Sequence, residues 1–286
     1  MSNNPSDVGQ VSEIITPGPA ARLAAILDLD PPDEELPELW HLGYLLEAPR
    51  SSDLGPEGHP RLGFPTPPAE GMRRMFAGGR IDTHRRLRFS RPATRTIQVT
   101  SQVEKTGRSG PLTFVTTRAH IVQDGELCIV EEQDILYRPA PPEHQPTSPA
   151  PQPQPHDDDT IELPDREARL DMAVDEALLF RFSAVTFNAH RIHYDREWVR
   201  AEGYDDLLVH GPLQALMMGE LARRHGHPLV GRRFSYRLIA PMTGAQTMHI
   251  LAADTGLTAG AEVRDRRGTI TATATYDPSP QQAGVR

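Results

Sequence analysis

The stretch of the chain richest in reactive side chains is FNAHRIHYD, residues 187–195, which holds His190 and His193. A third histidine, His210, follows 17 residues after His193 and directly precedes Gly211 in the sequence HGPL. Imidazole titrates near neutral pH, with an ordinary pKa of about 6.5, so it can accept a proton and return it. The spacing therefore favours acid–base chemistry near the start of whatever element follows His210.

That element is predicted to be a helix over residues 211–226, GPLQALMMGELARRHG, with proline near its first turn and arginines near its end. The first N–H groups of a helix have no partner within it and carry partial positive charge. Gly211 would let a carbonyl oxygen approach closely, so this site could hold a thioester oxygen and stabilise an enolate. The residues alone also allow a plainer interpretation, in which the histidines are simply hydrogen-bonded within a loop.

Two other chemistries find little support in the sequence. His190 and His193 with Asp195 form a His-x-x-His pattern, but no third ligand cluster stands at a characteristic spacing, so no metal site is predicted. A serine hydrolase is not expected either, because the chain has no G-x-S-x-G motif.

The elements that must position these residues follow the same order twice. Residues 16–29 predict a helix that Thr16 can cap, residues 31–71 are rich in loops, and strands are expected over 85–90, 94–107, 110–123 and 126–138. The later part predicts helices over 175–186, capped by Asp175, over 196–203 and over 211–226, then strands over 232–240, 245–254, 260–268 and 269–277. Helices followed by an antiparallel sheet, twice, indicate two copies of one α+β unit, although no internal repeat is visible.

A proline-rich tract separates the two parts. Nine of the 28 prolines lie within residues 139–164, which have no apolar periodicity and predict a semi-extended linker. The net charge of −9 argues against general nucleic-acid binding, and no apolar run is long enough for a membrane helix. The single cysteine, Cys128, and the polar N-terminus lead us to expect a cytoplasmic protein.

The segments FSAVTFNAHRIHYD (182–195) and EGYDDLLVHGPL (202–213) resemble the active-site region of the MaoC-like, or R-specific, hydratase and dehydratase superfamily. They are most similar to the branch of mesaconyl-C4-CoA (3-methylfumaryl-CoA) hydratase, itaconyl-CoA hydratase and type 2 3-hydroxyacyl-thioester dehydratase. The segments ITPGPAARLAAILD, LPELWHLGYLLEAP, MRRMFAGGR and RPATRTIQVTSQVEKTGRSGPLTFVTTRAHI are similar to the first unit of that branch. The resemblance implies a double hot-dog fold, in which each antiparallel sheet wraps a central helix. We expect a first hot-dog over residues 1–138 that forms the acyl pocket without a catalytic motif, the linker over 139–164, and a catalytic hot-dog over 165–286.

The superfamily motif D-x-N-P-x-H aligns its histidine with His193 and its catalytic aspartate with Asn188, so the chain departs from the motif there. An amide cannot accept a proton, but it can orient water or an imidazole. The resemblance implies that His193 carries the acid–base step, Asn188 positions water and Gly211 holds the thioester oxygen. His190 could be a second acid–base group or structural, and Asp195 could orient His193 or cap the next helix.

The reaction implied is reversible hydration of an α,β-unsaturated acyl-CoA, with mesaconyl-C4-CoA or itaconyl-CoA giving (S)-citramalyl-CoA. The alternatives are a 3-hydroxyacyl-thioester dehydratase of fatty-acid synthesis, a hot-dog thioesterase and a non-catalytic acyl-thioester binder. CoA would be part of the substrate, no separate cofactor is expected, the acyl carrier could instead be a carrier protein, and the family implies a homodimer. The candidate substrate-binding residues are Arg191, which could equally form a structural ion pair, Arg80 and Arg237, which could equally form strand-surface salt bridges, and His190 and His210.

Overall fold

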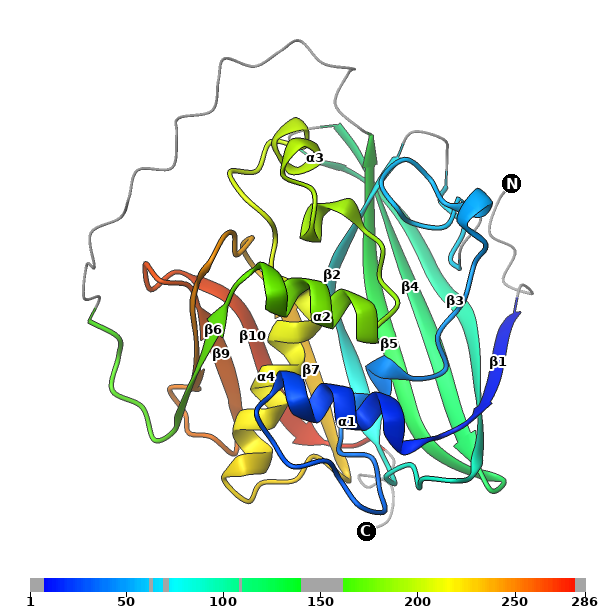
Figure 1. Cartoon of the computed structure of the whole chain (residues 1–286), viewed down its shortest axis with the longest axis vertical. Coiled ribbons are helices and arrows are strands. Elements are labelled where there is room, and N and C mark those ends of the chain that lie inside the picture. Colours follow the sequence, from blue (N-terminus) through cyan, green and yellow to red (C-terminus); the bar gives the residue numbers. More distant parts are fainter. Residues whose placement is uncertain (1–7, 62–63, 69–71, 108–109, 140–161, 281–286) are drawn as a thin grey trace.

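The computed structural model describes residues 8–61, 64–68, 72–107, 110–139 and 162–280, and it forms one ten-stranded antiparallel sheet wrapped around helices (Figure 1). The strand order is β1-β3-β4-β5-β2-β7-β10-β9-β8-β6. We call strands β1–β5 with their connections the first half, and strands β6–β10 with theirs the second half. The strands are β1 (Val8–Ile14), β2 (Met72–Thr83), β3 (Pro92–Gly107), β4 (Gly110–Gln123), β5 (Glu126–Pro139), β6 (Arg169–Val174), β7 (Arg232–Leu238), β8 (Gln246–Ala252), β9 (Gly260–Arg264) and β10 (Ile270–Pro278).

The two halves join where β2 pairs with β7, over residues 78–82 and 233–237. Gly78 and Gly79 make this seam possible. A Cβ atom on Gly78 would lie 2.4 Å from the carbonyl oxygen of Tyr236, and one on Gly79 would lie 2.3 Å from that of Glu132. The two glycines therefore let β2 fit between β5 and β7, so that one continuous sheet serves both halves.

The described residues form four α-helices: α1 (Pro17–Ile26), α2 (Glu176–Val185), α3 (Arg196–Ala201) and α4 (Gly211–Arg224). Helix α4 packs against β7, β8, β9 and β10, and ten of its 14 residues are buried, which makes it the central helix of the second half. Helix α1 packs against α2, and so it links the two halves. Trp40, in a short 3-10 turn (Trp40–Gly43), donates a hydrogen bond to Glu220 of α4 across 2.8 Å. One apolar core therefore spans both halves.

Most of the helix signals in the sequence are confirmed, with one correction at a cap. Asp175 caps α2 by accepting a hydrogen bond from the N–H of Leu178. Thr16 stands at the cap position of α1, but its side chain makes no capping hydrogen bond. The hydroxyl of Tyr44 replaces it, because it accepts from the N–H of Ala20 and donates to the carbonyl oxygen of Thr16.

The sheet departs from the prediction at its edges and at its seam. Strands β1, β2 and β6 were not predicted, and each owes its extended form to partners far along the chain. The strand predicted over residues 85–90 is wrong, because that segment forms only the isolated bridge between Glu35 and Arg88. The proline-rich tract lies largely outside the described residues, so its role as a tether stays a prediction.

Candidate active site

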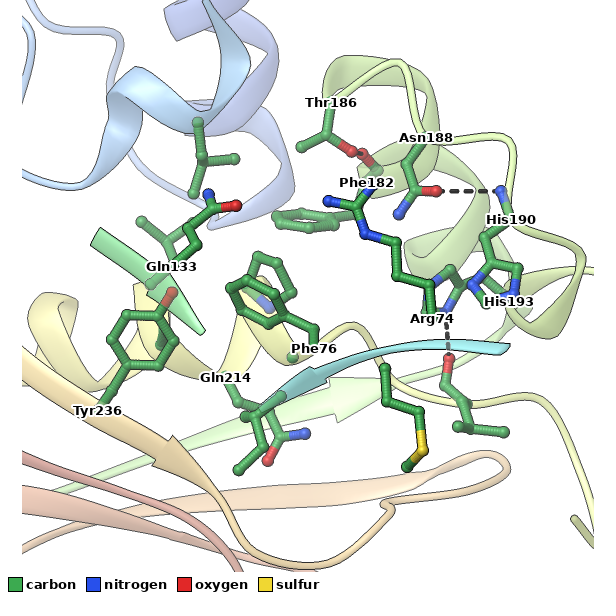
Figure 2. A pocket seen from close by; sticks show the side chains of 18 of the residues that line it. Arg74, Phe76, Gln133, Phe182, Thr186, Asn188, His190, His193, Gln214 and Tyr236 are labelled. Carbon is green, nitrogen blue, oxygen red and sulfur yellow. Dashed lines mark hydrogen bonds between the residues drawn. The ribbon is translucent and has the colours of Figure 1, made fainter. Parts of the chain in front are cut away.

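A cavity of about 740 Å³ lies between the two halves, and both line it (Figure 2). The second half contributes the candidate residues Asn188, His190, His193 and Gly211. The first half contributes a wall that includes His59, Arg73, Arg74, Phe76, Glu131 and Gln133. The predicted reactive residues are thus brought together, and they face residues that sequence reasoning did not single out.

Asn188 reaches the cavity because the chain leaves α2 through a left-handed residue. Phe187 has a φ of 50°, and the N–H of Asn188 then donates to the carbonyl oxygen of Ser183 across 2.8 Å. The side-chain oxygen of Asn188 accepts a hydrogen bond from the N–H of His190 at 3.0 Å. This bond occupies the amide oxygen, so the Asn188 NH₂ group is the part that can donate to a water or a substrate in the cavity.

His193 is held in one tautomer. It ends a 3-10 turn (Arg191–His193), and its Nδ1 lies 2.8 Å from the carbonyl oxygen of Leu208. A carbonyl only accepts, so Nδ1 carries the hydrogen and Nε2 keeps its lone pair. Burial lowers the pKa of His193 to about 4, although the bond to Leu208 opposes the shift. At neutral pH this imidazole is therefore a neutral base.

His210 packs against the imidazole ring of His193. Its ring stacks on that of His193, with ring centroids 3.6 Å apart and planes 17° from parallel. Its Nε2 lies 2.8 Å from the Ser183 hydroxyl, the residue is fully buried, and burial lowers the pKa of His210. His210 does not line the cavity, so the predicted contact with substrate gives way to a packing role beneath His193.

Gly211 is the first residue of α4 and lines the cavity, as predicted. Its N–H is one of the first-turn donors that have no acceptor within the helix, and it lies at the positive end of a 14-residue helix. A Cβ atom at this position would lie 2.3 Å from Cδ1 of Leu238. The absence of a side chain therefore keeps the helix start open towards the cavity.

His190 and His59 form a second ring pair in the cavity wall. Their centroids lie 4.2 Å apart, and the His190 ring also contacts the His193 ring edge to face at 5.8 Å. Burial, followed by the charges of neighbouring groups, lowers the pKa of His190 to about 2 and that of His59 to about 3. His190 thus faces the site, and sequence reasoning missed His59 because its partner lies 131 residues further along the chain.

The loop that carries His59 docks directly on the catalytic segment. Gly58 has a φ of 93°, and a Cβ atom there would lie 1.9 Å from the carbonyl oxygen of Ala189. The N–H of Arg191 donates to the carbonyl oxygen of Glu57 across 2.9 Å. Only glycine combines this backbone conformation with so close an approach, so the sequence at Gly58 positions first-half residues over the site.

Arg191 holds the His59 loop and the segment over residues 187–195 together, and it does not line the cavity. It donates to Asp195 and to the carbonyl oxygen of Pro56, and its guanidinium lies over the Trp198 ring, 4.4 Å from the centroid. Asp195 also caps α3 by accepting from the N–H groups of Glu197 and Trp198. The structural alternatives therefore hold for both residues: Arg191 forms an ion pair, and Asp195 caps a helix and does not orient His193.

Arg80 and Arg237 also lie away from the cavity. Arg80 is bound to Glu132 at 2.6 Å and to both carboxylate oxygens of Asp134 at 3.0 Å, a strand-surface salt bridge. Arg237 is exposed on β7 and alternates with the buried Tyr236. The structure thus gives neither arginine the predicted contact with substrate in the cavity.

The arginines that do line the cavity are Arg73, Arg74, Arg95 and Arg138, all from the first half. Arg73 and Arg74 belong to the segment MRRMFAGGR, whose paired arginines were visible in the sequence but carried no spacing signal. Arg73 forms an ion pair with Glu202 at the end of α3. The carboxyl group of Glu131 is buried, yet hydrogen bonds and charges from His41, Arg95 and Gln133 outweigh the effect of burial and lower its pKa to about 2. The first-half wall is therefore charged.

Among the residues that the structure describes, no group of three or more His, Cys, Asp or Glu side chains is placed to hold a metal ion. In the same described ranges, no helix combines the length and apolar character needed to cross a membrane.

Comparison with known proteins identifies the chain's relatives. The sequence model of the family "Hydroxyacyl-thioester dehydratase type 2" matches residues 39–244. The curated mesaconyl-C(4)-CoA hydratase of Chloroflexus aurantiacus is 43% identical over 268 residues, which cover 90% of this chain and 91% of that protein. This relationship confirms the predicted resemblance.

Solved structures confirm the fold. The crystal structure of HtdX from Mycobacterium tuberculosis superposes with a TM-score of 0.65 at 16% identity and covers 96% of this chain and 100% of that one. A conserved protein of the same organism, described as having a double hotdog fold, superposes with a TM-score of 0.53 at 16% identity, over 97% of this chain and 96% of that one. The architecture is therefore the predicted α+β double hot-dog.

Proposed function

Because the chain belongs to the hydroxyacyl-thioester dehydratase type 2 family, we propose that it is a hydro-lyase that reversibly adds water across the α,β double bond of an acyl-CoA thioester. One observation carries the proposal. The Nδ1–H of His193 is tied to the carbonyl oxygen of Leu208, so Nε2 is a free base in a cavity into which the N-terminus of α4 also opens.

The reaction follows from these groups. The thioester oxygen accepts a hydrogen bond from the Gly211 N–H, at the positive end of α4. His193 Nε2 takes a proton from a water molecule whose oxygen bonds to the β-carbon, and the double-bond electrons move towards the thioester oxygen to give an enolate. The Asn188 NH₂ group holds and orients the attacking water. The proton on His193 then passes to the α-carbon, which completes the addition and restores the neutral base.

The substrate we propose is mesaconyl-C4-CoA, with (S)-citramalyl-CoA as the product. The second candidate is itaconyl-CoA, whose double bond must first shift into conjugation with the thioester before water can add by this route. The 43% identical relative named mesaconyl-C(4)-CoA hydratase supports this choice. The charged wall formed by Arg74, Arg95 and Glu131 also supports it, since a short acyl group that bears a carboxylate suits such a wall better than a long alkyl chain does. The family description favours a second candidate, the dehydration of a 3-hydroxyacyl thioester, which is the same chemistry run in reverse.

The acid–base steps use only side chains and backbone groups of this chain, so we expect no metal or separate cofactor, CoA being part of the substrate. We also expect a cytoplasmic homodimer, built of hot-dog units over residues 1–138 and 165–286.

In the test, the purified protein is incubated separately with crotonyl-CoA, mesaconyl-C4-CoA and itaconyl-CoA. Both the enoyl absorbance and the release of free thiol are followed. We expect loss of enoyl absorbance without free thiol, fastest with mesaconyl-C4-CoA. For itaconyl-CoA, whose double bond is not conjugated with the thioester, the readout is the formation of citramalyl-CoA by mass spectrometry. Release of thiol would instead identify a thioesterase, and a ligand-induced rise in melting temperature with neither signal would identify a non-catalytic binder.

A further inference from the structure

We propose that Arg74 binds the free carboxylate that the substrate carries on its β-carbon, and so selects dicarboxylic acyl-CoA thioesters over simple enoyl-CoA thioesters. The inference rests on the proposed hydration and names the residue that sets its substrate class. In mesaconyl-C4-CoA the carboxylate is bonded directly to the β-carbon, the atom that water attacks. A cation that binds this carboxylate must therefore lie beside His193, on a wall of the same cavity.

The register of β2 places Arg74 on that wall. Arg74 pairs with Tyr137 of β5 and Phe76 pairs with Ile135, and alternation along a strand puts Arg74 and Phe76 on the same face as these buried residues. Arg73 and its partner Arg138 belong to the alternate set of side chains on these two strands, although both also reach the cavity. Figure 2 shows Arg74 on the same side of the cavity as Asn188, His190 and His193, whereas Gln133 and Tyr236 lie across from them.

The lowered pKa values of two histidines indicate that the positive charge of Arg74 lies close to them. After burial, the charge of Arg74 is the next cause that lowers the pKa of His59, and it also contributes to the low pKa of His190. The His190 ring in turn contacts the His193 ring at 5.8 Å. Arg74 is thus an electrostatic neighbour of the ring cluster that contains the catalytic base.

Arg74 and Arg138 are the arginines of the wall to which the described residues give no counter-ion, and of these two Arg74 is the one whose charge acts on His59 and His190. Among the described residues it makes no ion pair and no hydrogen bond, whereas Arg73 is bound to Glu202 and Arg95 lies near the ionised carboxylate of Glu131. A guanidinium without a counter-ion, beside three neutral histidines, can bind a carboxylate. The fork of N–H groups on the guanidinium matches the two oxygens of a carboxylate. A crotonyl group, with a methyl group in place of the carboxylate, would leave that fork empty.

The experiment compares kcat/KM for mesaconyl-C4-CoA and crotonyl-CoA in the wild type, R74Q and R74K. We expect R74Q to lower the mesaconyl-to-crotonyl ratio by about 100-fold, chiefly through the mesaconyl substrate, the size typical of removing one partner of a desolvated charge pair. R74K keeps the charge but loses the fork, so it should recover part of the ratio. The control is R237Q, which removes an exposed arginine outside the cavity and should leave the ratio unchanged.

A binding arm separates this inference from the proposed function. In the H193A background, where turnover is blocked, the affinities for the two thioesters are measured with and without R74Q. Selective loss of mesaconyl-C4-CoA binding supports Arg74 even if the wild type hydrates neither thioester, an outcome that would overturn only the proposed function. An unchanged ratio in both arms, or an equal loss for both thioesters in R74Q and R74K, would overturn the inference.

Discussion

Between its first and second strands the second half folds into helices α2, α3 and α4, whereas the first half follows α1 with an irregular segment over residues 27–61. The helices place a helix N-terminus, Gly211, and a constrained base, His193, at the cavity. The irregular segment instead places His59 against His190, the neighbour of that base, and β2 adds Arg73 and Arg74 to the cavity wall. The two halves share one fold class, and in the proposed mechanism they divide the work: the second half supplies the reactive groups, and the first half supplies the surface that contacts the acyl group.

This division has a physical basis. Helix α4 is buried against β7, β8, β9 and β10, so it brings only residues of its N-terminal part, between Gly211 and Leu216, to the cavity. In the part of the first half that the structure describes, no comparable helix packs against the sheet, so residues of β2, β3 and β5 line the cavity directly. The lack of such a helix among the described residues of the first half is therefore what leaves its strands free to line the cavity.

The largest expected effect is that of pH on stability, because four neutral histidines lie together where the two halves meet at the cavity. His59, His190, His193 and His210 all have pKa values lowered mainly by burial. Above pH 6.5 these residues are neutral in both the folded and the unfolded chain. As the pH falls from about 6.5 towards 4, the unfolded chain takes up protons that the folded chain refuses, so stability is lost over this window by up to about 5 kcal/mol per pH unit.

Urea unfolding at several pH values between 7.5 and 5 checks this prediction. The free energy of unfolding should fall steeply below pH 6.5, and H59Q should reduce the slope by about 1.4 kcal/mol per pH unit, the share of one histidine. A flat profile, or an H59Q slope equal to that of the wild type, would show that this first-half histidine titrates alike in both states.

The next largest effect is expected on the hydration rate, when one histidine from each half is replaced. H193A removes the proposed base and should lower kcat/KM for hydration at least about 100-fold, the scale of general acid–base catalysis. H59A removes a ring that touches His193 only through His190, so its effect should stay within about tenfold. Steady-state rates with mesaconyl-C4-CoA measure both variants. Equal losses would contradict the division of work, and near-normal turnover in H193A would refute the mechanism.

The sequence predicted the second half better than the first because its signals are local. Helix caps, apolar stripes and the His-Gly-Pro sequence at residues 210–212 depend on neighbours within a few positions, so these elements could be predicted, and the family resemblance led us to expect that Asn188, His193 and Gly211 meet. Arg74 could not be placed in this way. It lies in a strand whose segment holds a glycine pair and three arginines and no alternating pattern, and this segment is extended because β5 and β7 pair with it.

The same limit explains the arginines. Arg191 stands beside His193 in the sequence motif, but its side chain turns towards Asp195 and Trp198 and leaves the cavity. Arg80 finds carboxylates across the sheet, on a partner strand 52 residues away. A guanidinium takes the nearest unpaired acceptors, and which acceptors are near depends on strand register, which single-sequence patterns do not specify for a glycine-rich strand.

A smaller effect should follow from loosening the contact between the halves at Gly58. G58A places a methyl group 1.9 Å from the carbonyl oxygen of Ala189, and it strains a φ of 93°. The loop must move away, so we expect a loss of about 1–3 kcal/mol of stability and of several-fold in kcat/KM. The matched control is G125A, with a similar φ of 79° but nothing within 4 Å of the added methyl group. If both variants lose activity equally, backbone strain and not docking of the loop explains the result.

The smallest effect on activity is expected from cutting the proline-rich tract over residues 139–164, which separates the two halves in the sequence. A protease site inserted between residues 145 and 150 and then cut should leave kcat/KM within about twofold, because the halves are held by other contacts. Strands β2 and β7 pair across the seam, one apolar core spans both halves, and Trp40 is hydrogen-bonded to Glu220 of α4. Size-exclusion chromatography of the cut protein should give one peak that contains both fragments. Separation of the fragments at micromolar concentration would mean that the tract, and not the shared sheet, keeps the two halves together.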